Sequence, residues 1–496
     1  MLSLNKRNLS HLLLAIVLAY FACTNFHKLQ NNLWNDEIYT LNNFTLVHLK
    51  TTLTNYHSTN NHIFYNLVNH FYLKILGIND LKTLLESPWI LRLPLLLLAL
   101  LTLIYAYRLG KLAGGRTAGI IAVLLLATTI PFQNFSMQVR GYAFSVFFDL
   151  ALIFYLLNYL FTPKPKYLFL IGLLSFLAVY SIPLNLYCIV SIGAFLCVEA
   201  IWIKVSTGKT DVKYFYVLAA LTSAMILVLL CFIPIMKIVF NNQFVNAVDP
   251  FNIQFLHWLV QAVFKAFISE RYFLVALSLF GVLIYSTTLL WTSSRSNTIV
   301  KALLFQMTIP FAMVFIRGEQ PDDRTFIYMV PFFCVLLVIF VMAIIRLIPE
   351  ALKYPVVLAL ATYIIAAHFV ANRNLNEYMK EVLKNETRVQ SLYADYYLSN
   401  FDPLGVTHFL KQAGNDTIPV ILNDSEPHDM PDYLNAFNIP FHSIDSIDCF
   451  LEKKKQVFVI TRYPTQTRHL LLHEHCDSVE AVFKPSYLHI LKACNE

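Results

Sequence analysis

Long apolar stretches separated by short polar loops follow one another through most of this chain. A helix that crosses a membrane needs about 20 mostly apolar residues. The stretches therefore predict about eleven membrane-crossing helices. They are placed at residues 9–23, 89–108, 117–133, 141–161, 166–182, 183–203, 214–238, 272–292, 300–317, 324–346 and 354–371.

Residues 62–77 form a shorter stretch with a different pattern. Polar side chains recur there at helical spacing, which leaves one polar stripe on an otherwise apolar helix. This pattern predicts an amphipathic helix that lies at the outer membrane interface and does not cross it. A second interfacial helix is predicted at 255–266. The polar stripe consists of His62, Tyr65, Asn66, Asn69, His70 and Lys74.

The composition supports an integral membrane protein. Of the 496 residues, 57% are hydrophobic and only 14% are charged, and the mean hydropathy is +0.58. Soluble domains are charged at about a quarter of their positions. The net charge of +7 does not indicate a nucleic-acid partner, because the basic residues fall in short loops between apolar stretches. That placement is typical of orientation signals beside membrane lipids.

Basic loops alternate with loops that lack basic clusters. Because cytoplasmic loops carry the excess of Lys and Arg, the alternation predicts a cytoplasmic N-terminus. The loops 24–88 and 239–271 are then on the outer face, as is the C-terminal region. We expect a multi-pass protein of a bacterial inner (plasma) membrane. The basic loops are marked by Arg108, Lys111 and Arg116, then Lys164 and Lys166, Lys204, Lys209 and Lys213, Arg295 and Lys301, and Arg346 and Lys353.

From about residue 372 the composition becomes that of a soluble domain. Short apolar runs at 418–422 and 457–461, with a weaker one at 487–491, predict strands, and helical patterns lie at 406–412 and 429–437. We therefore expect a membrane module over 1–371 and a small extracytoplasmic α/β domain over 372–496. The eight cysteines show no spacing typical of a metal site.

Polar groups gather in the segments that the alternation places on the outer face. An acidic pair, Asp36 and Glu37, follows the first apolar stretch, and two adjacent carboxylates can bind a cation, pair with arginines or remove a proton from an acceptor. They can also be acids at the start of a helix, where the helix dipole favours them. Arg140 and Arg324 begin two apolar stretches. They suit phosphate oxygens or act as interface anchors. Asp149 lies within a membrane stretch, where an acid is functional by default.

The order of these motifs resembles the membrane glycosyltransferases of the GT-C fold. It runs from the acidic pair through Asn60-Asn61-His62, Arg92-Leu93-Pro94 and Arg140-Gly141-Tyr142 to Arg324, Tyr328 and Pro331. The resemblance covers about residues 9–346. It is nearest to the bacterial branch related to dolichyl-phosphate-mannose protein mannosyltransferases and lipid A aminoarabinose transferase. The chain departs from the pattern at two places, where the His-Pro-Pro start of the second motif is Asn60-Asn61-His62-Ile63 and the Pro of Arg-Pro-Tyr is Gly141.

The resemblance implies an inverting glycosyltransferase whose donor is a sugar on a polyprenyl phosphate. It implies Asp36 as the base, with Glu37 holding an arginine or orienting the acceptor. Arg140 and Arg324 would bind the donor phosphate. Four further substrate contacts are implied at Asn61, His62, Tyr142 and Tyr328. No cofactor is required by this scheme, although an acidic pair beside phosphate can bind a divalent metal.

Other functions fit parts of the pattern. A secondary transporter would also be a helical membrane protein, but such proteins typically show repeats and helices broken by Gly or Pro. A lipid-linked polysaccharide ligase or polymerase would share the donor, and a non-catalytic assembly protein would share the exported domain. The acceptor is left open between a lipid, a protein and a polysaccharide.

Overall fold

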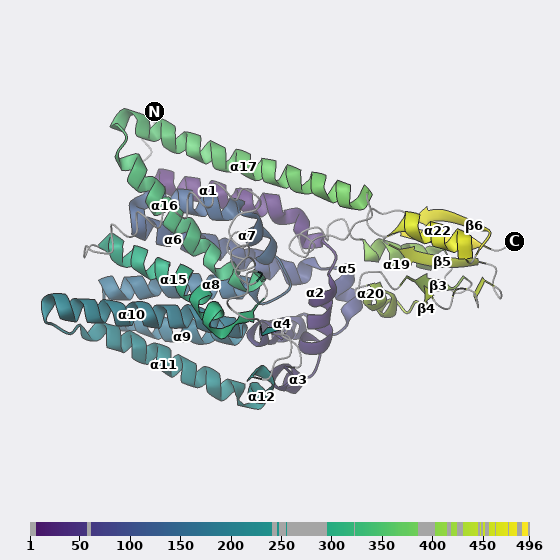
Figure 1. Cartoon of the computed structure of the whole chain (residues 1–496), viewed down its shortest axis with the longest axis horizontal. Helices are drawn as coiled ribbons and strands as arrows, with labels where there is room; N and C mark the ends of the chain where they lie inside the picture. The colour runs from purple at the N-terminus through teal and green to yellow at the C-terminus, as the bar shows by residue number, and fades with distance from the viewer. Residues whose placement is uncertain are drawn as a thin grey trace. The chain divides into compact units, whose positions relative to one another are not determined.

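The computed structural model of the chain describes the larger part of both the membrane helices and the C-terminal region (Figure 1). The described residues are 6–56, 61–240, 246–247, 254, 295–321, 323–384, 402–413, 418–423, 430–444, 447, 450–451, 456–461, 463–474, 476–483 and 489–494. The predicted crossing at 272–292 and the predicted interfacial helix at 255–266 fall outside these ranges.

Eight helices in the described residues are long and apolar enough to cross a membrane. The protein is therefore a multi-pass helical membrane protein, as the sequence predicts. The candidate spans are Asn8–Gln30, Trp89–Thr128, Tyr142–Phe161, Pro183–Thr207, Val212–Ile238, Arg295–Arg317, Arg324–Arg346 and Glu350–Asn374. The helix α9 (Pro165–Ser181) is apolar but shorter, and it lies at the crossing predicted for 166–182.

One of these spans combines two of the predicted crossings. The helix α6 (Trp89–Thr128) runs for 40 residues, through the basic segment that we expected to be a loop between 108 and 117. Gly115 breaks its regular geometry with a φ of 87° and a ψ of −174°. A side chain with a Cβ rarely adopts this left-handed conformation. The turn predicted by the charges is therefore a sharp break in a helix.

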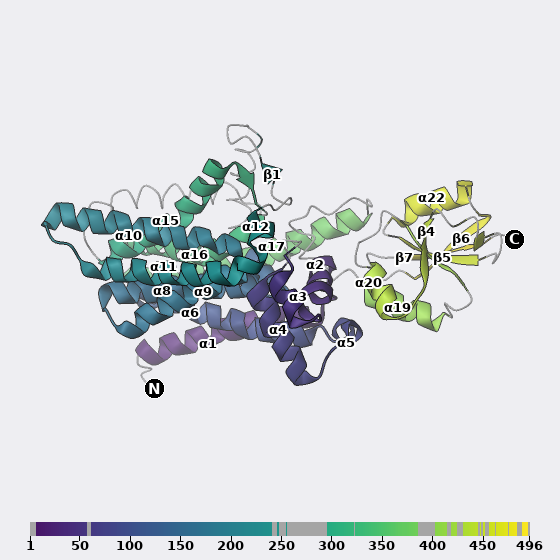
Figure 2. The ribbon, with the colours of Figure 1, turned by 90° about the horizontal axis from the view of Figure 1, so that it is seen from below.

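The long helices of the bundle pack side by side (Figures 1 and 2). The helix α8 (Tyr142–Phe161) is enclosed, contacting α9, α11 (Val212–Phe232), α15 (Arg295–Arg317) and α16 (Val330–Arg346). The helix α11 instead exposes a row of large apolar side chains, which is the surface a lipid bilayer covers. The exposed row includes Ile226, Leu227, Leu229 and Leu230.

Two opposite charges are buried together between α10 (Leu186–Thr207) and α15. The Lys301 ammonium lies 2.7 Å from a carboxylate oxygen of Glu199, and both side chains are buried. A single charge in this position would be costly, because the surrounding helices offer few polar groups to replace water. The pair thus fixes α10 against α15.

The helix α4 (Ile63–Leu76) is the amphipathic helix predicted at 62–77. Unlike a helix on the surface of a soluble protein, it buries polar side chains and exposes apolar ones. Asn66 and Asn69 on its polar stripe are buried. Phe71 and Ile75 on the apolar side are exposed, at 51% and 84% of their surface. A helix that turns its apolar side away from the protein suits a membrane interface.

The chain divides into two compact units that interleave along the sequence. The first consists of residues 1–26, 48–68 and 94–371, and the second of 27–47, 69–93 and 372–496. The second unit thus joins parts of the predicted outer loop 24–88 to the whole C-terminal region. The remaining bounds are α1 (Lys6–Asn25), η1 (Phe26–Gln30), α2 (Asn35–Thr40), η2 (Leu41–Thr45), α3 (Leu49–Thr54), α5 (Leu81–Glu86), α7 (Ile130–Phe135), η3 (Pro183–Asn185), η4 (Ile233–Ile235), α12 (Met236–Phe240), β1 (Asn246–Ala247), β2 (Glu319–Gln320), η5 (Asp323–Met329), α17 (Glu350–Lys384), α19 (Pro403–Gln412), α20 (Met430–Ala436) and α22 (Pro464–Glu474).

The C-terminal region contains a five-stranded mixed sheet in the order β4-β3-β5-β7-β6. The first three strands are parallel and the last two pair antiparallel. The three predicted strands correspond to β3 (Val420–Leu422), β5 (Gln456–Thr461) and β7 (His489–Cys494), and β4 (Phe441–Ser443) and β6 (Ser478–Phe483) were not predicted.

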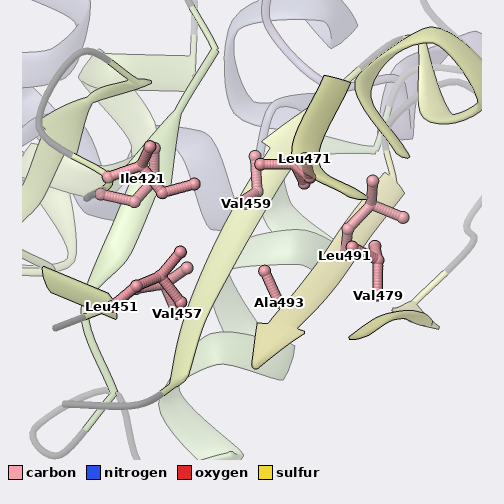
Figure 3. Packing of buried hydrophobic residues seen from close by; sticks show 9 residues of the cluster. Ile421, Leu451, Val457, Val459, Leu471, Val479, Leu491 and Ala493 are labelled. Carbon is pink, nitrogen blue, oxygen red and sulfur yellow. The ribbon is translucent and has the colours of Figure 1, made fainter. Parts of the chain in front are cut away.

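Alternate side chains of β5 face two different layers of helices. Val457 and Val459 join the buried cluster that includes Leu471 of α22 (Figure 3). Phe458 points the other way, where its ring lies 6.2 Å from that of Phe409 of α19. Because successive strand residues point to opposite faces, a continuous apolar run such as β5 requires cover on both faces. The region is thus a small α/β layer structure.

The buried pair in the bundle predicts a sharp effect of removing one charge. Lys301→Met should lower the free energy of unfolding by roughly 3–5 kcal/mol, because it leaves the Glu199 carboxylate buried without its cation. The double variant with Glu199→Leu should recover much of this loss. Thermal unfolding in one detergent would measure both.

The matched control is Lys353→Met, since Lys353 pairs with Glu350, whose side chain is 86% exposed. An exposed pair contributes about 0–1 kcal/mol. Equal effects of Lys301→Met and Lys353→Met would contradict the burial of the first pair.

Candidate functional site

The acidic pair lies in the first turn of α2. Trp34 is the N-cap residue, and its backbone N–H donates to a carboxylate oxygen of Glu37 at 3.2 Å. Glu37 is 1% exposed, whereas Asp36 is half-buried. The interpretation of the pair as helix-terminal acids therefore accounts for the position of Glu37, because a carboxylate there satisfies a helix N–H and meets the positive end of the dipole.

Arg92 is the partner of Glu37. Its guanidinium lies 2.9 Å from the Glu37 carboxylate, and both side chains are buried. The same guanidinium donates to the backbone carbonyl of Asn31 and, at 3.2 Å, to that of Asn32. In the sequence, Arg92 was noted only as part of Arg-Leu-Pro. The signal available in the sequence was the charge of Arg92 near the start of the apolar stretch 89–108, where an unpaired charge is costly.

Asn61 shapes the loop before α4. Its amide nitrogen donates to the carbonyls of Thr52 at 3.0 Å and Asn55 at 2.6 Å, and its oxygen accepts from the Asn66 amide at 2.9 Å. Both N–H bonds and the oxygen are thus used within the protein. This arrangement holds the backbone in front of His62.

His62 contacts the Arg140-Gly141-Tyr142 motif at the start of α8. The backbone N–H of Gly141 donates to His62 Nδ1 at 3.0 Å, and the ring meets that of Tyr142 edge-on at 5.3 Å. Because Nδ1 accepts, the hydrogen of the neutral imidazole is on Nε2. A guanidinium group of Arg140 lies 3.4 Å from that nitrogen. Since guanidinium N–H groups only donate, two donors converge there.

Positive charge surrounds this imidazole. Arg140 is buried, with its guanidinium 5.1 Å from the centre of the Tyr142 ring. Burial, and then the charges of Arg140 and Arg324, hold the pKa of His62 well below its usual value of 6.5. The ring therefore stays neutral when the pH falls below 6.5, and keeps Nε2–H as a donor beside two cations. Such a cluster suits an anion with several oxygens, such as a phosphate.

The two departures from the family pattern meet at this contact. A proline at position 141 would have no N–H to donate to His62. A Cβ on Gly141 would lie 2.4 Å from His62 Nδ1, so the ring occupies the space that any larger residue would need. His62 therefore needs a residue at position 141 that has a backbone N–H and no Cβ, and Gly141 meets both requirements.

Tyr328 and Asp149 lie deeper in the same unit. Tyr328 is 1% exposed and lies in η5, which contacts α8. Asp149 of α8 is fully buried beside the Ser145 hydroxyl and the Cys188 thiol, which are its polar neighbours. Cys188 comes from α10 and carries no signal of Asp149 in the sequence, whereas Ser145 is four residues before Asp149 on the same helix.

The structure assigns the candidate residues to two different units. Asp36 and Glu37 belong to the second compact unit, and the cluster around His62 belongs to the first. Within the first unit, His62, Arg140 and Tyr142 are in contact, and Arg324 acts on His62 electrostatically. In the described part of the chain, no three His, Cys, Asp or Glu side chains gather as a metal site would require.

Comparisons with known proteins identify the fold. No protein-family model and no curated protein matches the sequence. Among solved structures, the chain is similar to the Archaeoglobus fulgidus oligosaccharyltransferase in its apo form, at 13% identity and a TM-score of 0.50, over 95% of this chain and 72% of that chain. The oligosaccharyltransferase AglB from Archaeoglobus fulgidus, in complex with an inhibitory peptide and a dolichol-phosphate, matches at 13% identity and a TM-score of 0.50, over 93% of this chain and 70% of that chain.

ArnT from Cupriavidus metallidurans bound to undecaprenyl phosphate matches at 12% identity and a TM-score of 0.49, over 98% of both chains. The fold shared with the oligosaccharyltransferases is the GT-C fold. The chain is thus a multi-pass membrane protein of GT-C fold, and the resemblance found in the sequence is confirmed.

Because Gly141 lies so close to His62, adding a single methyl group at position 141 should destabilise the protein. Gly141→Ala should lower the free energy of unfolding by about 1–3 kcal/mol, because the Cβ forces the imidazole out of its position. Gly193→Ala in α10 is the control, since its Cβ would meet no atom within 4 Å. Alanine there should be neutral or stabilising. Equal unfolding temperatures for the two variants would refute the predicted clash.

Proposed function

We propose that the protein is an inverting glycosyltransferase that moves a sugar from a polyprenyl-phosphate-linked donor to an acceptor. The observation that carries this proposal is the cluster at the start of α8, where the Arg140 guanidinium and the Nε2–H of a neutral His62 converge beside Arg324. The GT-C fold supports it, because AglB of the same fold was solved with a dolichol-phosphate.

In the proposed reaction an acceptor oxygen attacks the anomeric carbon of the sugar. The bond from that carbon to the phosphate oxygen breaks, and the configuration inverts. Negative charge grows on the leaving phosphate. Arg140, Arg324 and the His62 N–H stabilise this charge, and a buried setting strengthens their effect.

The proton of the acceptor goes to Asp36 in this scheme. A general base within reach of the acceptor contributes about 10²–10⁴-fold to the rate. Glu37 has a different role, because its carboxylate is already taken by Arg92 and by the Trp34 N–H. We assign Glu37 to holding the segment 31–37, which contains both acids and is called the acidic loop below. The scheme uses no metal.

Tyr142 and Tyr328 have supporting roles in the proposal. The Arg140 guanidinium lies over the Tyr142 ring, in a cation–π contact, and the same ring contacts His62 edge-on. Tyr328 is buried four residues after Arg324, in η5, which contacts α8. We further propose that the reaction takes place at the outer face of a bacterial inner membrane, with a lipid, a protein or a polysaccharide as acceptor.

We call Arg140 and Arg324, in their proposed contact with the donor phosphate, the clamp. It can be tested by binding of undecaprenyl phosphate to the purified chain in nanodiscs. Arg140→Gln should weaken this binding by about 10- to 100-fold, since it removes a charge-assisted hydrogen bond. Arg140→Lys should give an intermediate affinity, because it keeps the charge and loses the planar fork. Arg346→Gln is the control, an exposed arginine at the end of α16. Unchanged affinity in a folded Arg140→Gln variant would rule out the clamp.

The base can be tested by turnover. Asp36→Asn should lower the release of undecaprenyl phosphate from synthetic undecaprenyl-phosphate hexoses, supplied with cell-envelope extract, by about 10²–10⁴-fold. Binding of undecaprenyl phosphate should stay within a factor of two, roughly, because the base does not hold the phosphate. Glu86→Gln, an exposed acid on α5, is the control. Full activity of Asp36→Asn would show that another group takes the proton.

A further inference from the structure

Three successive backbone carbonyls lead into α2, and each accepts a hydrogen bond from a distant side chain. Arg92 donates to the carbonyls of Asn31 and Asn32. The next carbonyl, that of Leu33, accepts from the Tyr433 hydroxyl at 3.0 Å. Tyr433 is 400 residues away in the sequence, on α20 of the C-terminal region.

This hydrogen bond is enclosed. Tyr433 and Leu33 are both 0% exposed, so no bulk water replaces the phenol hydroxyl if it is lost. Leu33 directly precedes the N-cap of α2, and Asp36 is the second residue of that helix. The direction of the Asp36 carboxylate therefore depends on where the Leu33 carbonyl is held.

One further hydrogen bond joins the segment before α2 to the C-terminal region, and a third contact lies on the neighbouring helix α5. The Asn32 amide lies 3.4 Å from a carboxylate oxygen of Asp402, which also caps α19 by accepting from the Gly405 N–H at 2.9 Å. On α5, the Lys82 ammonium lies 5.2 Å from the centre of the Phe437 ring. The segment before α2 is thus attached to the C-terminal region at two points, Leu33 and Asn32, and the neighbouring helix α5 is attached separately through Lys82.

We propose that the C-terminal α/β region positions the acidic loop, and that the Tyr433 hydroxyl is the group through which it acts on Asp36. The inference rests on the proposed function, in which Asp36 is the base. Tyr433 is a positioning residue. It touches no reacting atom and acts by fixing the backbone from which α2 starts. This gives the C-terminal region a part in the transfer reaction itself.

The test uses Tyr433→Phe in the full chain, which removes the hydroxyl and keeps the ring. Turnover of undecaprenyl-phosphate hexoses should fall roughly 10- to 100-fold, because a small displacement of a catalytic group has effects of this size. The KM for the donor should not change. Thr467→Val is the control, since it removes the buried 2.7 Å contact with Thr461 inside the same region, away from α2.

A double variant separates positioning from general stability. In the Asp36→Asn background, Tyr433→Phe should cause no further loss of turnover, because both changes act on one group. A further loss of the original size would overturn the inference. Full activity of Asp36→Asn alone would instead overturn the base assignment in the proposed function, which distinguishes the two failures.

Hydrogen exchange reports on the loop without any turnover. Backbone amides in a peptide covering residues 30–38 should exchange faster in Tyr433→Phe than in the unaltered chain, and Thr467→Val should leave them unchanged. Unchanged exchange in Tyr433→Phe would overturn the inference even if activity fell. Should Tyr433→Phe fail to fold, Asp402→Asn removes the negative charge from the oxygen that accepts from both Asn32 and the Gly405 N–H, and it should accelerate exchange in the same peptide.

Discussion

A guanidinium group removed from water needs acceptors for its N–H groups and an anion for its charge, and Arg92 obtains both from a single loop. The carbonyls of Asn31 and Asn32 and the Glu37 carboxylate are all directed at it. Because leaving any of these groups unpaired in a buried site is costly, the loop has little freedom to rearrange. The position of Asp36, one residue before Glu37, follows from this constraint. The two adjacent acids look alike in the sequence but have different environments. Glu37 is buried and bound to Arg92, whereas Asp36 is half-buried at the start of the same helix.

A second constraint operates around His62, where a neutral ring lies between cations. Adding a third positive charge there would be unfavourable, so burial and the two arginines keep the imidazole uncharged. The Gly141 N–H determines which nitrogen carries the hydrogen. A neutral donor adds to the hydrogen-bonding capacity of the arginines without adding repulsion, which suits a phosphate with several oxygens. A proline at position 141 could not make this contact, because it has no N–H to donate to His62.

Much of the membrane fold could be predicted from single stretches of sequence. Span lengths and the polar stripe of α4 depend on local periodicity, and both agree with the structure. The break in α6 was predicted near the correct place by Arg108, Lys111 and Arg116, although as a loop, because charge marks where a chain turns but not whether its helix is interrupted at one glycine. The strands β4 and β6 were missed because they lie at the two edges of the sheet, where strand formation depends on the neighbouring strand more than on local sequence. The candidate residues were found by motif order, whereas Arg92 was not given its role because its partner lies 55 residues away.

The sequence by itself determined the class of protein, most of the helical spans in the described residues, the amphipathic helix and the residue types available at the candidate site. These depend on hydrophobicity and charge, which local sequence contains in full. Only the tertiary structure decided which groups are held and which nitrogen of His62 is a donor. It also decided that the C-terminal region contacts the backbone in front of α2. These facts depend on contacts between residues tens to hundreds of positions apart, and no local pattern specifies them. The hydroxyl of Tyr433 on the carbonyl of Leu33 is the clearest case, since neither residue carries any signal of the other in the sequence.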